Sequence, residues 1–347
     1  MSPRTSVFLT GATGYIGGSV LARLLSHPSR NSFDISVLVR SAEKAKDLEA
    51  FGVHAIVGST ADSSLVQDLA SQAHVVFSCA DSDDLDAIEA VLRGLKQRHA
   101  AAADMPILIH TSGTGQLTFD GNTKGMSATK KIYYDDDPDE IESFPSTAPH
   151  RIVDTTIVQA DEDGYVKTYI VFPSTIWGIA RHPLAEAGIS NAHSSQIPRL
   201  IKTSLARRQA GMVGKGLALW PDVEIAEQAD LYITLYDGAV SGSDALGHGR
   251  NGYYFGENGE HPWYDISKEI GRLFVQRGFS KTAEPTAFSV EELIKYFGSE
   301  EFGNSYGSNS RARANHSRSI GWAPRLTSSD MLKSIEAELD AILVLGQ

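Results

Sequence analysis

The fold of this chain is decided by nine residues near its start, Leu9-Thr10-Gly11-Ala12-Thr13-Gly14-Tyr15-Ile16-Gly17. Their glycines are spaced GxxGxxG, after an apolar run at 5–10 and before apolar residues that recur every four positions, Val20 and Leu24 among them. A buried strand, a tight turn and an amphipathic helix in this order are typical of a site that binds a dinucleotide pyrophosphate at the helix N-terminus. We therefore predict a dinucleotide site here, with a plain strand–turn–helix glycine cluster as the alternative.

Outward from this turn, short apolar runs alternate with helical stretches through the first half of the chain. We expect strands at residues 5–10, 35–39, 55–57, 75–77, 107–109 and 169–172. Strands separated by helical stretches of about ten to fifteen residues predict βαβ crossovers and a parallel sheet. The predicted fold class is therefore α/β, a doubly wound parallel sheet (Rossmann fold).

The second half of the chain has a weaker strand–helix rhythm. Helical periodicity returns around residues 225–240, 266–275 and 331–345, which favours a smaller C-terminal substrate-binding cap rather than another sheet. We expect residues 1–178 to form the dinucleotide-binding Rossmann domain. Residues 179–347 are expected to form mainly the cap, interleaved with that domain.

Composition excludes several classes of protein and partner. The 347 residues are 41% hydrophobic and 21% charged, which is typical of a folded globular chain. With 31 basic and 43 acidic residues, the net charge of −12 and the lack of a basic stripe argue against nucleic acid as a partner. Cys79 is the sole cysteine and the histidines are scattered, so we expect neither a disulfide nor a metal site.

The sequence also indicates where in the cell the protein is expected. No apolar run reaches the roughly 18 residues of a membrane span, and no secretory leader is visible. The expected setting is cytoplasmic, with no membrane partner. The expected partner is a small-molecule substrate, and a homo-oligomer is left open.

Five segments, in the same order, resemble extended and atypical short-chain dehydrogenases/reductases, a group that includes nucleotide-sugar epimerases and NmrA-like proteins. They are residues 9–17, 111–112, 172–178, 213–230 and 320–324. The resemblance implies a Rossmann fold with a dinucleotide cofactor. It also implies that Ser112 lies beside the reacting carbon and that the proline loop at 172–178 lies along the nicotinamide.

The end of the second predicted strand bears on which dinucleotide is bound. A carboxylate there would bind the ribose hydroxyls of NAD and repel a 2′-phosphate. This chain instead has Arg40, which can pair with a 2′-phosphate through two hydrogen bonds, with Ser41 and Lys44 nearby. We therefore predict NADP as the cofactor, with two solvated surface cations as the alternative. From the turn, this strand end and the resemblance, the predicted cofactor-binding residues are Gly11, Thr13, Gly14, Tyr15, Ile16, Gly17, Arg40, Ser41, Lys44, Cys79, Ala80, Thr111, Pro173, Thr175 and Ile176.

The catalytic residues implied by the resemblance are a tyrosine and a lysine four positions later, on the helix before the sixth strand. This sequence has His150 and Asp154 at that spacing. An imidazole titrates near neutrality and can donate a proton, and Asp154 could orient it by accepting its other N–H. The candidate catalytic residues are Ser112, His150 and Tyr133, the last on a long polar loop after Ser112. The alternatives are a helix-terminal histidine, a satisfied strand-end serine and a tyrosine that anchors its loop.

A Tyr-x-x-x-Lys spacing does occur at Tyr264 and Lys268. It lies in the cap half, on a helix whose apolar residues serve packing, and the resemblance places that helix away from the nicotinamide. We interpret this pair as structural.

Three hypotheses for function follow from these residues. The first is an NADP-dependent oxidoreductase that acts on a carbonyl, imine or activated alkene of a small organic molecule, with a nonstandard proton donor. The second is an NADP(H)-binding sensor or regulatory protein without turnover, which the missing tyrosine and lysine favour. The third is a non-redox epimerase, isomerase or lyase on the same fold. A full-length cap favours the enzymes, because the resemblance implies that the cap shapes a substrate pocket.

Overall fold

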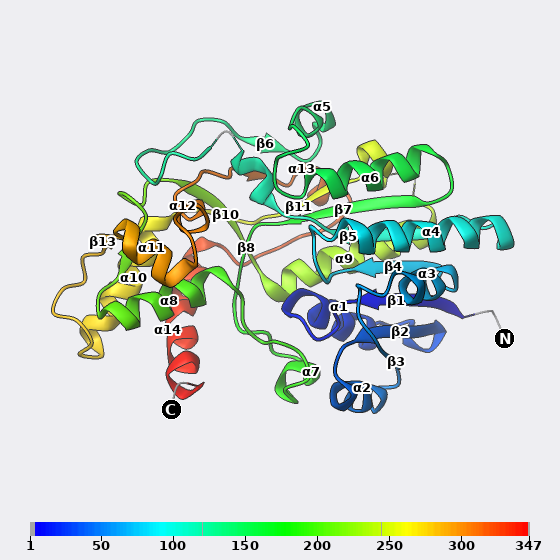
Figure 1. Ribbon diagram of the computed structural model, residues 1–347, viewed down its shortest axis with the longest axis horizontal. Coiled ribbons are helices and arrows are strands. Elements are labelled where there is room, and N and C mark those ends of the chain that lie inside the picture. Colours follow the sequence, from blue (N-terminus) through cyan, green and yellow to red (C-terminus); the bar gives the residue numbers. More distant parts are fainter. Residues whose placement is uncertain (1–3, 120, 244, 346–347) are drawn as a thin grey trace.

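A seven-stranded sheet forms the centre of the computed structural model, which describes residues 4–119, 121–243 and 245–345 (Figure 1). The strand order is β11-β7-β5-β4-β1-β2-β3, and every pairing between neighbours is parallel. In chain order the strands are β1 (Thr5–Thr10), β2 (Phe33–Val39), β3 (His54–Val57), β4 (Val75–Ser78), β5 (Ile107–Thr111), β7 (Lys167–Pro173) and β11 (Tyr253–Gly256). The chain starts with β1 inside the sheet and winds outward in both directions, so the predicted doubly wound Rossmann topology is confirmed.

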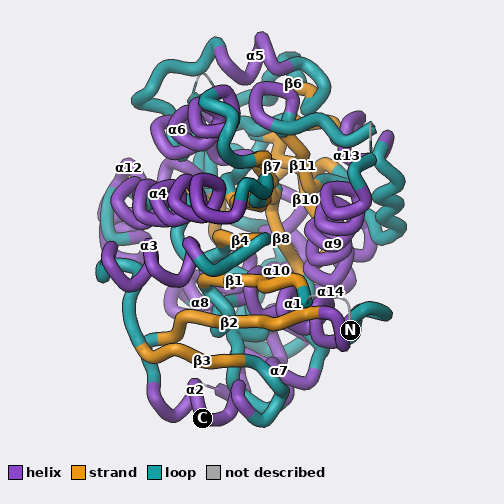
Figure 2. Tube along the Cα trace, turned by 90° about the vertical axis from the view of Figure 1, so that its right-hand side faces the viewer, coloured by secondary structure: helices purple, strands orange, loops and turns teal. Residues whose placement is uncertain are grey.

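Helices cover both faces of this sheet. Figure 2 shows α3, α4 and α6 on one face and α1 and α9 on the other. The helices are α1 (Tyr15–Leu25), α2 (Ala42–Glu49), α3 (Ser63–Ser71), α4 (Leu85–Ala102), α6 (Arg151–Glu162) and α9 (Ile225–Ser241). Val20, Leu21 and Leu24 of α1 are fully buried in the core under the sheet, because apolar positions three or four residues apart share one side of a helix.

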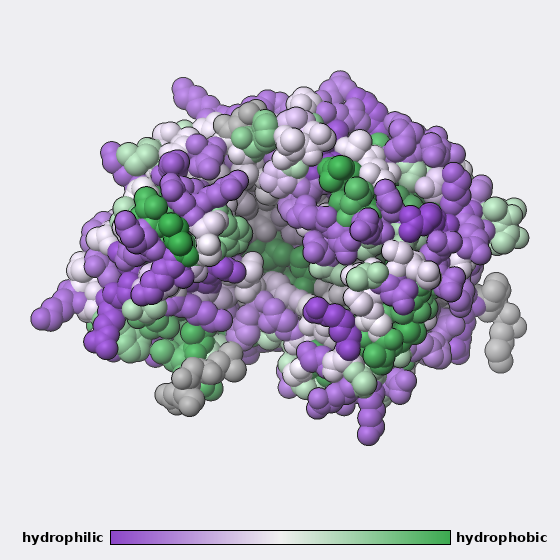
Figure 3. Space-filling model, viewed as in Figure 1, coloured by the Kyte–Doolittle hydropathy of each residue, from purple (hydrophilic) through white to green (hydrophobic). Residues whose placement is uncertain are grey.

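Most of the second half forms a smaller lobe with its own apolar core, which includes Trp263, Ile266 and Phe274. Its helices are α8 (Gln196–Arg207), α10 (Trp263–Gln276), α11 (Val290–Phe297), α12 (Glu300–Ser305) and α14 (Ser328–Leu345). The surface is hollowed between the two lobes, with hydrophobic residues on the floor of the hollow (Figure 3).

The expectation that the cap contains no further sheet is wrong. A three-stranded sheet of order β12-β10-β8 joins the lobes, and it is built from β8 (Thr175–Trp177), β10 (Leu219–Glu224) and β12 (Glu260–Pro262). These strands are short, and β10 carries Pro221 and Asp222, so they lack the apolar alternation from which a strand is predicted.

Part of the second half returns to the large sheet. β11 pairs in parallel with β7, and α9 packs against α1. β11 was not predicted, because Tyr253, Tyr254 and Phe255 form an apolar run of only three residues between glycines. All three side chains are buried.

The remaining elements are short and hold the loops in place. They are α5 (Pro138–Glu142), α7 (Pro183–Glu186), α13 (Asn315–Ser319), the pair β6 (Tyr133–Tyr134) and β14 (Ala312–Arg313), and the pair β9 (Gly211–Met212) and β13 (Thr286–Ala287). The long polar loop is held by Asp135, whose buried carboxylate accepts hydrogen bonds from the backbone N–H groups of Phe255 and Ser317, each at 3.0 Å. Within the described residues, no helix has the length and hydropathy of a membrane span.

Candidate active site

The glycine turn after β1 has a geometry that side chains would prevent. Gly11 has a φ of +77°, and a Cβ at this position would lie 2.5 Å from the carbonyl oxygen of Cys79 at the end of β4. A Cβ on Gly17 would lie 2.3 Å from the carbonyl oxygen of Gly11. The turn leads into α1, which begins after Gly14 without a side-chain cap. The first backbone N–H groups of α1 are therefore available to an anion, as a pyrophosphate requires.

A cavity of about 300 Å³ opens beside this turn, and we call it the turn cavity. Six of the predicted cofactor-binding residues line it: Gly14, Tyr15, Ile16, Cys79, Ala80 and Ile176. Burial raises the pKa of the Cys79 thiol to about 12, so this wall of the cavity carries no thiolate at neutral pH. The cavity is consistent with the fit of a dinucleotide, because a bare helix start and uncharged strand ends meet in it.

The other side of the turn cavity was not predicted. It is lined by Ser174, by Asn191 and by residues 193–196, in the segment that leads into α8. The backbone N–H of Asn191 donates to the carbonyl oxygen of Thr13 at 3.0 Å, which fixes this segment against the glycine turn. The His193 Nδ1 lies 2.7 Å from Oε1 of Glu338 in α14. No sequence pattern marks such a segment, since its partners are distant in the chain.

The remaining predicted cofactor residues are not part of the lining of this cavity. The Thr111 hydroxyl lies 2.8 Å from the Tyr232 hydroxyl, and Pro173 and Thr175 are buried. After β2, the Ser41 hydroxyl caps α2 by accepting from the N–H of Lys44 at 3.2 Å. Arg40 is exposed and forms no ion pair with any residue that the structure describes.

Ser112, at the end of β5, is hydrogen bonded to a buried carboxyl group. Its hydroxyl donates to Oδ2 of Asp154 at 2.8 Å. Asp154 is fully buried in α6, and its Oδ1 has no hydrogen-bond partner among the described residues. Burial raises the pKa of Asp154 to about 7, although the Ser112 hydrogen bond and the nearby His150 and Arg151 act in the opposite direction. Burial thus favours the neutral form of this carboxyl group.

His150 stands at the start of α6 with an unusual backbone. Its φ of +65° lies in the left-handed region, which residues other than glycine seldom adopt and which is often found at functional sites. Asp83 holds it there: Oδ1 of Asp83 accepts from the His150 backbone N–H at 3.1 Å and lies 2.9 Å from Nδ1. The other ring nitrogen, Nε2, faces Gly113 and Gly115, where a Cβ on either residue would lie 3.2 Å away.

The Asp83 pairing sets the protonation of His150. Burial alone would lower the pKa of the imidazole. The hydrogen bond to Asp83 and the negative charges of Asp83 and Asp154 outweigh burial and raise that pKa above its usual value. The same hydrogen bond lowers the pKa of Asp83. The expectation that Asp154 orients His150 is therefore wrong in this structure: Asp83 accepts from the ring, and Asp154 accepts from Ser112 instead.

A further histidine lies behind this pair. His110 is fully buried in β5, and neither ring nitrogen has a hydrogen-bond partner among the described residues. Burial lowers the pKa of His110 to about 3, so its imidazole is neutral. In the part of the chain that the structure describes, no three His, Cys, Asp or Glu side chains are placed to share a metal ion.

Comparisons with known proteins give this geometry its context. Residues 3–103 match the model of the NmrA-like family. The oxidase ucsJ of Acremonium sp is 27% identical over 339 residues, which cover 92% of each chain. Among solved structures, the UDP-glucose 4-epimerase of Thermotoga maritima is 14% identical with a TM-score of 0.67, covering 98% of this chain and 100% of that one. The UDP-glucuronic acid 4-epimerase of Bacillus cereus, solved with UDP-glucuronic acid and NAD, is 13% identical with a TM-score of 0.62, covering 97% and 100%.

The predicted resemblance is confirmed. The chain is similar to the NmrA-like and epimerase/dehydratase branches of the short-chain dehydrogenases/reductases, and its fold is theirs. His150 and Asp154 begin the helix on which that resemblance implies a tyrosine and a lysine. His150 and Asp154 thus differ from what the resemblance implies for the start of α6.

None of the candidate proton donors, Ser112 and His150 included, lines the turn cavity, and the two tyrosines considered from the sequence lie in other surroundings. Tyr133 is buried in β6, where its ring packs on Phe144 with centroids 5.1 Å apart. The Tyr264 hydroxyl donates to Oε1 of Glu284 at 2.9 Å, and Lys268 pairs with the same carboxylate. That group is on the surface of α10 in the smaller lobe. Catalysis by Tyr133 stays a prediction that the geometry gives no added reason to favour.

Proposed function

We propose that this protein is an NADP-dependent oxidoreductase that transfers hydride between a nicotinamide and a carbonyl, imine or activated alkene of a small organic molecule. The observation that carries the proposal is the His150–Asp83 pair, with Nε2 directed at the glycines after β5. The resemblance implies that the reacting carbon lies beside this strand end. The match to the oxidase ucsJ supports redox chemistry, and the NAD in the Bacillus cereus epimerase structure supports a nicotinamide cofactor.

The residues that would hold the cofactor are those of the glycine turn and the end of β2. The first turn of α1 would bind the pyrophosphate through backbone N–H groups. Arg40 is exposed and unpaired within the described residues, so it is available to a 2′-phosphate beside the ribose. A bound nicotinamide would supply or accept the hydride, and the protein would supply binding, orientation and the proton.

His150 is suited to give that proton during reduction. The proton would leave Nε2 for the substrate oxygen or nitrogen as hydride reaches the neighbouring carbon. Asp83 stabilises the charged ring beforehand and keeps the remaining proton on Nδ1 afterwards. The donor is thus an imidazole held by a carboxylate, in the place where the resemblance implies a phenol held by a lysine.

Ser112 can give a second hydrogen bond to the same oxygen only in one protonation state of Asp154. A serine hydroxyl has one hydrogen, and in this structure it points to Asp154 Oδ2. When Asp154 is protonated, the carboxyl group can donate to Ser112, and the serine hydrogen is then free for the substrate. Asp154 therefore acts through Ser112 as a positioning residue.

The same hydrogen bond favours a second candidate function. With Asp154 ionised, the Ser112 hydrogen is fully used inside the protein, as in a binding protein that performs no chemistry. An NADP(H) sensor without turnover would have this arrangement. A panel of carbonyl, imine and enone substrates with NADPH separates the two functions. The proposal expects oxidation of NADPH with at least one class, and tight binding of NADPH without oxidation across the panel would establish the sensor instead.

A further inference from the structure

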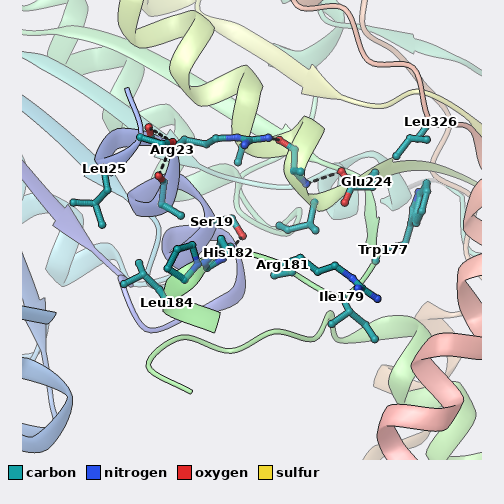
Figure 4. Close-up of a pocket in the computed structure, with 18 of the residues that line it drawn as sticks. Ser19, Arg23, Leu25, Trp177, Ile179, Arg181, His182, Leu184, Glu224 and Leu326 are labelled. Carbon is teal, nitrogen blue, oxygen red and sulfur yellow. Dashed lines mark hydrogen bonds between the residues drawn. The ribbon is translucent and has the colours of Figure 1, made fainter. Parts of the chain in front are cut away.

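A second cavity lies further along α1 than the turn cavity, and we call it the α1 cavity (Figure 4). Its volume is about 600 Å³, within the range of small-molecule sites. Its walls come from α1, from residues 177–184, from the start of α9 and from α14. Most of the lining is apolar, with Leu25, Ile179, Leu184 and Leu326 among the side chains around the empty space.

The α1 cavity is separate from the turn cavity. The two share no lining residue, and the Tyr15 ring stands between them. Its hydroxyl donates to the carbonyl oxygen of Gly178 at 2.5 Å, and the ring packs with Ala180 and Ile225 in a small buried cluster. A ligand in the α1 cavity would therefore not occupy the place predicted for the cofactor.

Among the described lining residues, three of the four titratable groups are ion-paired, hydrogen-bonded to a helix end or neutral. The Arg23 guanidinium pairs with Oδ1 of Asp230 at 2.8 Å. The Glu224 carboxylate caps α9 by accepting from the N–H groups of Ala226 and Glu227 at 2.7 and 3.0 Å. Burial lowers the pKa of His182, so this ring is neutral at pH 7.

Arg181 is the fourth titratable group, and it differs from the others. Its guanidinium has no hydrogen bond or ion pair with any described residue, and it lies beside Ile179 at the rim of the cavity (Figure 4). A mostly apolar cavity with one unpaired cation at its edge matches a ligand with an apolar body and one negative charge. We propose that the α1 cavity binds a small apolar carboxylate, whose charged end pairs with Arg181 and whose chain lies against α1 and α9.

Calorimetric titration of the full chain with decanoate, and with decanol as the uncharged match, tests this proposal. We expect decanoate to bind at one site, with affinity that Arg181→Met lowers by roughly tenfold, as loss of a charged hydrogen bond implies. Decanol should bind equally well to both proteins. Arg208→Met is the matched control, because Arg208 is also exposed but lies outside the cavity.

Unchanged decanoate affinity in the Arg181→Met protein would overturn the pairing with Arg181, and a second variant tests whether the probes occupy this cavity. Ala22→Trp fills the cavity from α1 and should abolish binding of both probes, whereas Ala100→Trp, on the exposed side of α4, should not. NADPH should bind the Ala22→Trp protein normally, which shows that the variant is folded and that the two sites are separate. The proposal is overturned if decanoate does not bind, or if it binds the Ala22→Trp protein as tightly as the starting protein.

Discussion

The glycine turn after β1 has the features expected of a dinucleotide site, whereas the first turn of α6 departs from what the resemblance implies. At the glycine turn, the features expected of a dinucleotide site are present: a positive φ at Gly11, a close approach at Gly17 and an uncapped helix start. At α6, the residues that would perform the chemistry are replaced, and His150 has an unusual backbone held by Asp83. Under the proposed function, cofactor binding and proton transfer are carried by separate parts of the sheet edge, so a substitution at one should leave the other in place.

The reason for the difference is physical. The glycine turn depends on backbone geometry that few residues allow, so almost any substitution there would destroy it. A proton donor needs only a titratable group at the right place with a suitable pKa, and an imidazole or a phenol can fill that role. Substitutions at the two sites test whether cofactor binding and proton transfer can be separated.

The largest effect is expected at His150. If it donates the proton, His150→Gln should lower kcat by about 10²–10⁴-fold and leave the affinity for NADPH nearly unchanged. Steady-state kinetics with the best substrate of the panel, and fluorescence titration with NADPH, measure the two quantities. Tyr264→Phe is the control and should change neither; a loss of turnover in that variant alone would show that the catalytic helix is α10.

The next effect is expected at the glycine turn. Gly14→Val places a branched side chain where a pyrophosphate must approach the backbone, and its Cβ would already lie 3.1 Å from the carbonyl oxygen of Gly11. Affinity for NADPH should fall by about 100-fold or more, a change of about 2.7 kcal/mol, with secondary structure retained. A folded variant that binds NADPH as before would place the phosphates elsewhere.

The pH profile tests the link between Ser112 and Asp154. Reduction needs a proton on His150 and, for the second hydrogen bond, a proton on Asp154, so kcat should fall as pH rises through about 7. Loss of the His150 proton gives a fall of about tenfold per pH unit at high pH. Loss of the Asp154 proton adds a finite decrease, because it removes one hydrogen bond to the substrate oxygen rather than the proton donor. In Asp154→Asn the amide can donate to Ser112 at every pH, so only the His150 step should remain, and a pH profile unchanged by this substitution would remove Asp154 from the reaction.

Stability gives an independent check on the same carboxyl group. Its pKa is raised in the folded state, so its contribution to stability is present below the pKa of the unfolded chain and is lost as pH rises toward about 7. The Asp154→Asn protein should therefore gain in free energy of unfolding, relative to the starting protein, between pH 4 and pH 8. Urea unfolding at the two pH values measures this difference, and an equal difference at both would mean that Asp154 is not the titrating group.

The smallest effect is expected at Arg40. If its guanidinium pairs with a 2′-phosphate, NADPH should bind about tenfold more tightly than NADH, which is about 1.4 kcal/mol. Arg40→Asp should remove or reverse that preference. Equal affinities in the starting protein would overturn the choice of NADP while leaving the turn as a dinucleotide site.

The sequence predicted what depends on local periodicity. The strands of the large sheet up to β7 and the helices α1, α4, α9, α10 and α14 follow from apolar spacing, since each buries one face or one whole run. β11 and the three-stranded sheet were missed because short strands are stabilised by neighbours that lie far away in the chain.

The candidate site was predicted only in part, for the same reason. Asp83 is 67 residues from His150, and nothing near either residue indicates that they meet. The pairing of Ser112 with Asp154 spans 42 residues, and sequence spacing alone suggested the wrong partner for Asp154. The segment 191–196 is placed at the turn cavity partly by backbone hydrogen bonds that any sequence could make, to Thr13 and Ala180.

That last segment has a consequence for the timing of the reaction cycle. Residues 191–196 are held by three contacts: the Asn191 N–H donates to the Thr13 carbonyl, the Ala192 carbonyl accepts from the Ala180 N–H, and His193 pairs with the buried Glu338 of α14. A dinucleotide bound in the turn cavity would be enclosed on one side by this segment. Its release past this side would require these contacts to open, so under the proposed function its exchange would be slower than that of a substrate entering between the lobes.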